Sequence, residues 1–242
     1  MRTKTTNIIN KDILLIGVLF FVFGFVTWLG SVLIPYLKIA CELSTFESYL
    51  VAFSFYISYT VMALPSAWVL RKTGSKKGMA LGLFIMGIGA LMFIPAATTR
   101  WYGLFLSGLF IQGAGLTILQ SASNPYITKL GDPESAATRI SIMGICNGIA
   151  GVMAPLLLGA VILNDADTMN NSIHVLVGAE KNAALNLLAG RVILPYAIIM
   201  VILALLAVLI YYSKLPELDT DEEDGAVSAA NENKKNIGRA HV

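Results

Sequence analysis

Six long runs without a single charged residue or histidine constrain this chain more than any other feature. They contain 22 to 28 residues each and occupy 13–37, 48–70, 78–99, 101–128, 140–164 and 192–213. A helix needs about 20 apolar residues to cross a hydrocarbon core of roughly 30 Å, so each run is long enough to span a membrane. Only 13% of the residues are charged, against about 25% in an average soluble domain. The sequence predicts an all-α membrane protein, a bundle of six transmembrane helices.

Two other interpretations of the apolar runs fail. The run 13–37 follows Arg2, Lys4 and Lys11, as a secretory signal would. It is longer than the 7–15 apolar residues typical of a signal, however, and lacks a small-residue cleavage site. Continuous apolar stretches such as 201–208 contradict the alternating strands of a membrane β-barrel.

Lysine and arginine are distributed unequally between the connecting segments. If the N-terminus is inside, nine basic residues outside the tail fall on cytoplasmic segments and four fall on outer segments. Short cytoplasmic segments carry an excess of Lys and Arg. We therefore expect both termini and the loop from Arg71 to Lys77 to face the cytoplasm.

The chain divides into a membrane bundle, 1–213, and a tail, 214–242. Six of the eight residues from Glu217 to Asp224 are acidic, and small polar residues follow, which is typical of a disordered cytoplasmic linker. The one long connection, 165–190, is expected to be a solvated outer cap, although 179–190 has the composition of a short surface helix.

A shift of 90 residues aligns the first span with the fourth. Thr27, Ser31 and Pro35 then meet Thr117, Ser121 and Pro125, and the same shift brings Pro65 onto Pro155. Because the first span enters from inside and the fourth from outside, the sequence predicts a 3+3 inverted repeat, which is a pattern of secondary transporters.

Enzyme signatures are absent from the sequence. It contains no H-E-x-x-H, Walker or G-x-S-x-G motif, and both histidines, His174 and His241, lie outside the runs. We therefore expect no enzyme, no ATP-driven pump, no cofactor, no metal site and no nucleic-acid partner. Cys41 and Cys146 are expected to act as small apolar residues.

The spans do contain neutral polar side chains. On the fourth span Gly113, Thr117, Gln120 and Asn124 follow spacings of four, three and four, which places them on one helix face. Thr27 and Ser31 share a face of the first span, and Asn147 lies in the fifth.

A sugar hydroxyl both donates and accepts hydrogen bonds, as Gln and Asn amides do, so these residues are candidate substrate contacts. The alternative is hydrogen bonding between helices. For Gln120 we favour substrate contact, and for Asn147 the two roles are equally expected. Asn124 is expected instead to repair the backbone break at Pro125. Trp28, Tyr56 and Tyr59 are candidates for stacking on a sugar ring, although contact with lipid or with a neighbouring helix is the commoner role.

Glycines at helical spacing and one basic loop are further features of the sequence. Gly78 and Gly82 on the third span, and Gly144, Gly148, Gly151 and Gly159 on the fifth, predict close helix packing. The loop RKTGSKKG is an orientation signal or a gating element, in which Arg71, Lys72 and Gly74 would take part.

Three segments carry a family resemblance. The loop after the second span is similar to the signature loop of the major facilitator superfamily, although Arg71 occupies the place of the usual acidic residue. Residues 20–38, with FFVFGFVTWLGSVLIPYLK, and 119–148, with LQSASNPYITKLGDPESAATRISIMGICNG, resemble the fucose:proton symporter family, the branch of fucose and glucose/galactose permeases. The resemblance covers the first five spans.

The resemblance implies the N-terminal half of a twelve-helix sugar transporter of the bacterial inner membrane, working by alternating access. Gln120 and Ser31 match positions at which the fucose permease has carboxylates, and Asn147 matches a substrate-facing Asn. Gln120 also matches the glucose/galactose branch, which implies a neutral hexose and leaves proton coupling open. The alternatives are a non-transport membrane subunit, a homodimeric half-transporter, and a channel or uniporter.

Overall fold

The computed structural model describes residues 11–162 and 176–217, which form six membrane-length spans. Their helices are α1 (Lys11–Ala40), α2 (Thr45–Thr73), α3 (Ser75–Leu91) with α4 (Phe93–Thr99), α5 (Tyr102–Lys129), η1 (Pro133–Ser135) with α6 (Ala136–Ile162), and α8 (Gly178–Gly190) with α9 (Ile193–Tyr212). The prediction of an all-α bundle with six spans is confirmed.

Most of these helices extend beyond the charge-free runs, and at the start of α2 a capping group sets the end. Before α2, the Ser44 hydroxyl accepts the Glu47 N–H, and the Glu47 carboxylate accepts the Ser44 N–H. This reciprocal capping box satisfies two backbone donors and starts the helix three residues before the apolar run. At the other end, Gly74 has φ 78° and ψ 171°, a conformation that only glycine adopts readily.

A proline lies just after the interruption in each of the two interrupted spans. Pro95 and Pro195 each lack an N–H, and each ring clashes with the carbonyl four residues earlier. Those carbonyls belong to Leu91, the last residue of α3, and to Arg191, just after α8. The third and sixth spans are each built from two helices, whereas Pro35, Pro65, Pro125 and Pro155 lie inside continuous helices.

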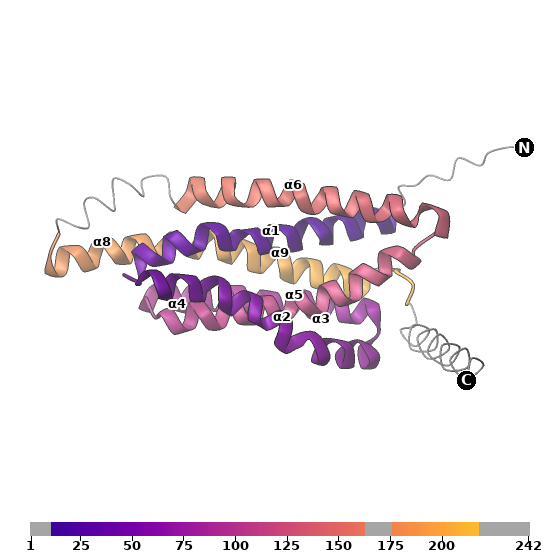
Figure 1. The fold of residues 1–242 in the computed structure, drawn as a ribbon, viewed down its shortest axis with the longest axis horizontal. Helices are drawn as coiled ribbons and strands as arrows, with labels where there is room; N and C mark the ends of the chain where they lie inside the picture. Colours follow the sequence, from indigo (N-terminus) through magenta and orange to yellow (C-terminus); the bar gives the residue numbers. More distant parts are fainter. Residues whose placement is uncertain (1–10, 163–175, 218–242) are drawn as a thin grey trace, which may run out of the picture.

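Figure 1 shows how the spans pair: α1 runs along α6, α2 lies along α5, and α3 packs against α5 and α9. Exchanging the first three spans with the last three maps the α1–α6 pair onto the α5–α2 pair, whereas the close α3–α5 pair has no equally close counterpart between α9 and α1. The start of α1, the α2–α3 turn, the α5–α6 turn and the end of α9 lie at one end of the bundle, and α8 lies at the other.

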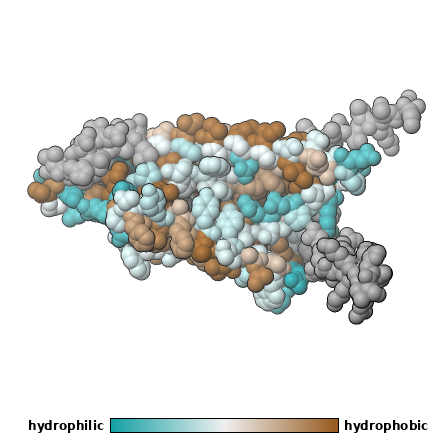
Figure 2. All heavy atoms as spheres, viewed as in Figure 1, coloured by the Kyte–Doolittle hydropathy of each residue, from teal (hydrophilic) through white to brown (hydrophobic). Residues whose placement is uncertain are grey.

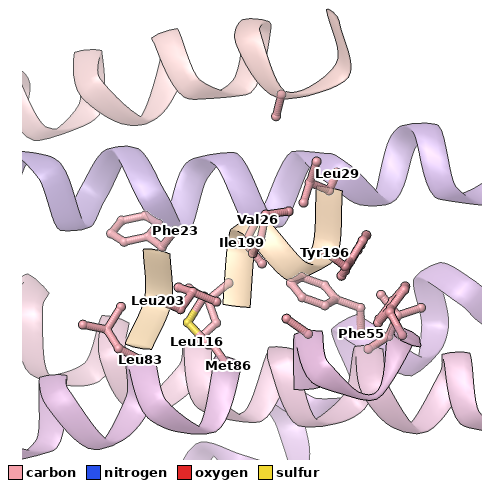
Figure 3. Close-up of a cluster of buried hydrophobic side chains, with 14 of the residues drawn as sticks. Phe23, Val26, Leu29, Phe55, Leu83, Met86, Leu116, Tyr196, Ile199 and Leu203 are labelled. Carbon is pink, nitrogen blue, oxygen red and sulfur yellow. The ribbon is translucent and has the colours of Figure 1, made fainter. Parts of the chain in front are cut away.

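An apolar core lies between α1, α3, α5 and α9 (Figure 3). Phe23, Leu83, Leu116 and Leu203 are all at most 4% exposed. The α3–α5 contact is close because it uses glycine: a Cβ at Gly82 would lie 2.7 Å from the carbonyl oxygen of Gly115. Close approach of small residues is the main way in which membrane helices gain packing energy.

The segment that the sequence predicts to be a solvated outer cap is more buried than expected. Residues 178–190 form α8, in which Leu185, Leu188 and Ala189 are buried, and the Tyr36 hydroxyl donates to the carbonyl of Leu188 at 2.7 Å. The alternative of a helix is thus correct for this part. The rest of this connection, 165–175, and the tail from 218 lie outside the described residues.

Within the described chain, three of the glycines on α6 do not form the predicted close contacts. No atom lies within 4 Å of a Cβ placed at Gly144, Gly148 or Gly159, whereas a Cβ at Gly151 would lie 2.8 Å from the Trp28 indole nitrogen. The first three therefore lie on a face of α6 that the described chain leaves uncovered.

Candidate functional site

The predicted site residues lie on three helices of the bundle. Thr27 and Ser31 lie on α1, Gln120 and Asn124 on α5, and Asn147 on α6. Ser31 and Asn124 are exposed, and the other three are partly buried. Figure 2 shows pale and hydrophilic residues in the middle of the face on which α1, α2, α5 and α6 are seen, with hydrophobic residues toward its upper and lower edges. We call these five residues the polar wall.

The amides of the polar wall are uncommitted. Within the described part of the chain, the side chains of Gln120, Asn124 and Asn147 form no hydrogen bond. The backbone of Asn147 nevertheless lies against α1, since a Cβ at Gly24 would lie 2.8 Å from the backbone carbonyl oxygen of Asn147. The backbone repair that the sequence favoured for Asn124 is therefore not formed. All three amides can bond to a ligand or to water.

The hydroxyl groups of the wall are bound to their own helix. Thr27 Oγ1 donates to the carbonyl of Phe23 at 2.7 Å, and Ser31 Oγ donates to that of Trp28 at 2.8 Å. Each hydroxyl oxygen keeps lone pairs, so both residues remain acceptors. The wall therefore combines hydroxyl acceptors with amides that donate and accept, and its residues bear no ionisable group.

Only part of the predicted polar face of α5 is open. A Cβ at Gly113 would lie 2.5 Å from the carbonyl oxygen of Phe55, and Thr117 is buried and donates to the Gly113 carbonyl. The half of this face near Gly113 therefore packs on α2. The other half, with Gln120 and Asn124, belongs to the wall.

Sequence reasoning missed two polar side chains in the adjoining cavity. This cavity, of about 210 Å³, lies between α1, α2, α5 and α9, and its lining includes Thr27, Ser31, Trp28, Tyr56, Gln112 and Tyr196. Gln112 was identifiable as a carboxamide within the charge-free run 101–128. Tyr196 had no such signal, because nothing in its sequence context distinguishes it from a packed aromatic.

The candidate gating loop is fixed by the segment after α9. The Lys76 N–H donates to Glu217 Oε1 at 3.2 Å, and the Tyr126 hydroxyl donates to the Pro216 carbonyl at 2.8 Å. Arg71 is exposed, and the Lys72 ammonium lies 3.9 Å from the centre of the Trp68 ring. Glu217 thus supplies a carboxylate where the loop itself has none.

The described residues do not provide a set of ligands for a metal ion. Among residues 11–162 and 176–217, no three His, Cys, Asp or Glu side chains gather in a group that could hold a metal ion. What the polar wall offers is hydrogen bonding.

Comparison with known proteins agrees with this chemistry. The chain is 35% identical over 224 residues to a glucose/galactose transporter of Brucella abortus, covering 92% of this chain and 51% of that protein. It is 32% identical over 209 residues to the L-fucose-proton symporter of Escherichia coli, covering 86% and 48%. The chain therefore spans about half the length of the curated relatives it matches, and these relatives are transporters, not enzymes.

A solved structure supports the fold. The crystal structure of FucP, a Major Facilitator Superfamily transporter in the outward conformation, matches with a TM-score of 0.73 at 32% identity, over 86% of this chain and 50% of that one. The family model of the Major Facilitator Superfamily matches residues 16–237. The six-helix bundle with its uncharged polar wall thus belongs to a member of the Major Facilitator Superfamily.

Proposed function

We propose that this chain forms one wall of a hexose transporter that works by alternating access. The observation that carries the proposal is the polar wall, in which the amides of Gln120 and Asn147 lack hydrogen-bond partners within the described chain. Relatives that are glucose/galactose transporters support a neutral sugar as the substrate.

The chemistry of the wall suits a neutral sugar. Each sugar hydroxyl donates one hydrogen bond and accepts others, and a carboxamide offers both kinds of group. The faces of a sugar ring carry C–H groups, which the exposed rings of Trp28 and Tyr56 can cover. Gln120, Asn147, Thr27, Ser31 and Asn124 are the proposed substrate contacts.

A transporting unit also needs a second six-helix bundle. Amides that face the hydrocarbon interior without partners are costly, so the polar wall must be covered by protein or by a water-filled cavity. The uncovered glycines Gly144 and Gly148 leave α6 free for a close helix neighbour. We infer that a second bundle of the twelve-helix type packs there and encloses the sugar near the middle of the membrane.

The proposal also includes the location and orientation of the protein in the membrane. The basic residues of the connecting segments favour cytoplasmic termini in a bacterial inner membrane. Because the polar wall has no titratable side chain near neutral pH, a proton-coupling group, if symport occurs, is expected on the second bundle.

Uptake into liposomes tests this function. Residues 1–217 would be joined to the second half of the Brucella abortus relative, and labelled D-galactose and D-glucose would be supplied. We expect saturable uptake that the combined Gln120→Ala and Asn147→Ala variant reduces. A joined protein that inserts and folds but takes up neither sugar contradicts the proposal and favours a non-transport membrane subunit.

A further inference from the structure

An open groove lies between α3 and α9, at the end of the bundle where α2 turns into α3. Its volume is about 450 Å³, and its lining comes from the end of α2, the first half of α3 and the last turns of α9. None of its lining residues belongs to the polar wall or to the cavity beside that wall. The groove is therefore separate from the proposed sugar site.

Two alanines leave the space for this groove. Ala80 of α3 and Ala207 of α9 line it and are 6% and 7% exposed, so they form its floor. Phe84 and Val208 also line it but are each 56% exposed, so they form its sides. Helix α3 begins at the end of the bundle where α9 ends (Figure 1), and from Lys77 to Phe84 it rises about 10 Å. One leaflet contributes roughly 15 Å of hydrocarbon, so the groove can hold the upper part of an acyl chain.

The two ends of the groove differ in chemistry. Toward Phe84 and Val208 the lining is apolar, whereas Lys77, Tyr211 and Tyr212 line the end near the α2–α3 turn. All three of these polar residues are exposed. Their ammonium and hydroxyl groups form no hydrogen bond or salt bridge within residues 11–162 and 176–217. Tyrosine and lysine near the end of a membrane helix lie at the level of the lipid head groups, so these groups are open to a head group.

Positive charge exceeds negative charge at this polar end. The Lys76 ammonium donates to the carbonyl of Ser213, which brings the first turn of α3 next to the residue before Lys214. Three lysines, at 76, 77 and 214, therefore lie near one another. Glu217, which accepts the backbone N–H of Lys76, is the carboxylate beside them. Three cations and one anion leave an excess of positive charge at the end of an otherwise apolar groove.

Exposed apolar side chains surround the groove along the two helices. Leu205 and Val208 on α9 are 64% and 56% exposed, and Ile88, further along α3, is 40% exposed. In a membrane such side chains meet the hydrocarbon chains of lipids. Lipid chains are therefore the molecules that reach the groove.

We propose that the groove binds one anionic phospholipid, with an acyl chain between α3 and α9 and the phosphate at Lys77. The phosphate oxygens accept hydrogen bonds from the Lys77 ammonium and from the hydroxyls of Tyr211 and Tyr212. A choline or ethanolamine head group brings a further cation against the lysines and binds more weakly. Basic pockets between membrane helices are typical sites for anionic head groups. The proposal does not depend on sugar transport.

Quenching of a single tryptophan tests the lipid site in the 242-residue chain, reconstituted in lipid nanodiscs. Replacing the three native tryptophans by phenylalanine, together with Tyr211→Trp, leaves one indole at the groove. Phosphatidylglycerol with brominated acyl chains, which quench tryptophan on contact, would be mixed in rising proportion with phosphatidylcholine, and the labels would then be exchanged. We expect phosphatidylglycerol to bind about five- to 30-fold more tightly, because one lysine near a membrane surface contributes about 1 kcal/mol and two contribute about twice that.

Two pairs of variants locate the preference within the groove. Lys77→Gln is expected to lower it about five-fold, whereas Lys72→Gln, at an exposed lysine that lies over the ring at position 68, is expected to keep it. Ala207→Leu fills the floor and is expected to lower it as well, whereas Ala204→Leu, at an exposed position of the same helix, is expected to keep it. Should Ala207→Leu fail to fold, the lysine pair alone decides, because both lysines are exposed.

The outcomes are distinct. Equal affinity for the two lipids, or a preference that survives Lys77→Gln, overturns the lipid site. A preference that Lys72→Gln lowers as much as Lys77→Gln shows a diffuse attraction of the basic turn for anionic lipid and also overturns it. Each of these results leaves the proposed sugar transport standing, since the groove shares no residue with the polar wall.

Discussion

Arg139 shows how a charged residue can be buried in this bundle without an acidic partner among the described residues. It is 1% exposed, and its guanidinium donates to the carbonyls of Ile127 and Thr128 at the end of α5 and to that of Asp132 in the turn, at 2.9–3.0 Å. A helix C-terminus carries partial negative charge on its unpaired carbonyls, so the cation and these carbonyls stabilise one another.

Replacing Arg139 is therefore expected to destabilise the protein. Lysine cannot reach three carbonyls at once, so Arg139→Lys should lower the free energy of unfolding by about 2–4 kcal/mol. Thermal unfolding in detergent, followed by helical circular dichroism, measures the change. Arg71→Lys, at an exposed position, is the matched control, and equal melting of the two variants would show that the Arg139 network is dispensable.

Gln120 should behave in the opposite way, affecting binding and not stability. Its amide is partly buried and forms no hydrogen bond within the described chain, so Gln120→Ala removes no internal contact of that kind. In the complete transporter we expect sugar affinity to fall about five- to 150-fold while the melting temperature changes little. Ser107→Ala, an exposed position on the same helix, serves as control. Unchanged affinity in a folded Gln120→Ala protein would remove Gln120 from the site.

Between elements, an ion cluster connects the α1–α2 turn with α8 and with the residue after α4. The Glu42 carboxylate pairs with Lys181 of α8 and, at 3.5 Å, with Arg100, which follows α4. The hydrogen bond from Lys181 lowers the pKa of Glu42 below its ordinary value of 4.5, and Arg100 contributes in the same direction. A carboxyl with a lowered folded-state pKa adds stability above its unfolded pKa, and this stability is lost as the pH falls through the folded pKa.

The cluster therefore predicts a pH-dependent difference between two proteins. Wild type should melt slightly above Glu42→Gln at pH 7, and the difference should disappear in acid below the ordinary carboxyl range. Because Glu42 is largely exposed, the effect should be small and should also shrink in high salt. A difference that persists in strong acid would contradict the ionic origin.

Helix positions were predictable from sequence, whereas helix faces were predictable only in part. Charge-free runs locate hydrocarbon-embedded segments well because charged groups are costly there, yet they say little of which side of a helix meets another. Gly82 packs on α5 as predicted, but Gly144 lies on an uncovered face. Gln112 was missed because it lies one residue before Gly113, the first member of the polar series that the sequence places on one face of α5. Its environment depends on α3 and α9, which no local spacing reveals.

At the scale of the whole molecule, the orientation in the membrane remains a prediction with a direct test. The α2–α3 turn and the α1–α2 turn lie at opposite ends of the bundle. Single cysteines introduced as Lys77→Cys and Ser44→Cys would be treated in intact cells with an impermeant maleimide. We expect only Ser44→Cys to react, since the basic turn should face the cytoplasm. Burial raises the pKa of the native Cys41 thiol to about 11, so its own reaction should be slow. Reaction of Lys77→Cys from outside would reverse the topology.

The last prediction is that the 242-residue chain binds sugar but does not move it across a membrane. Alternating access requires two bundles that rock about a substrate held between them, and the described spans supply one wall, with the amides of Gln120 and Asn147 open on it. One wall can hold a ligand weakly, but it cannot close over the ligand from either side. Liposomes containing the chain alone should therefore show no saturable uptake of labelled galactose, whereas the protein joined to a second six-helix half should show it. The matched control is the joined protein with Gln120→Ala, which should insert equally well and transport less. Saturable uptake by the chain alone would instead mean that two copies pair through the uncovered face of α6, and Gly144→Leu, which fills that face, should then abolish it.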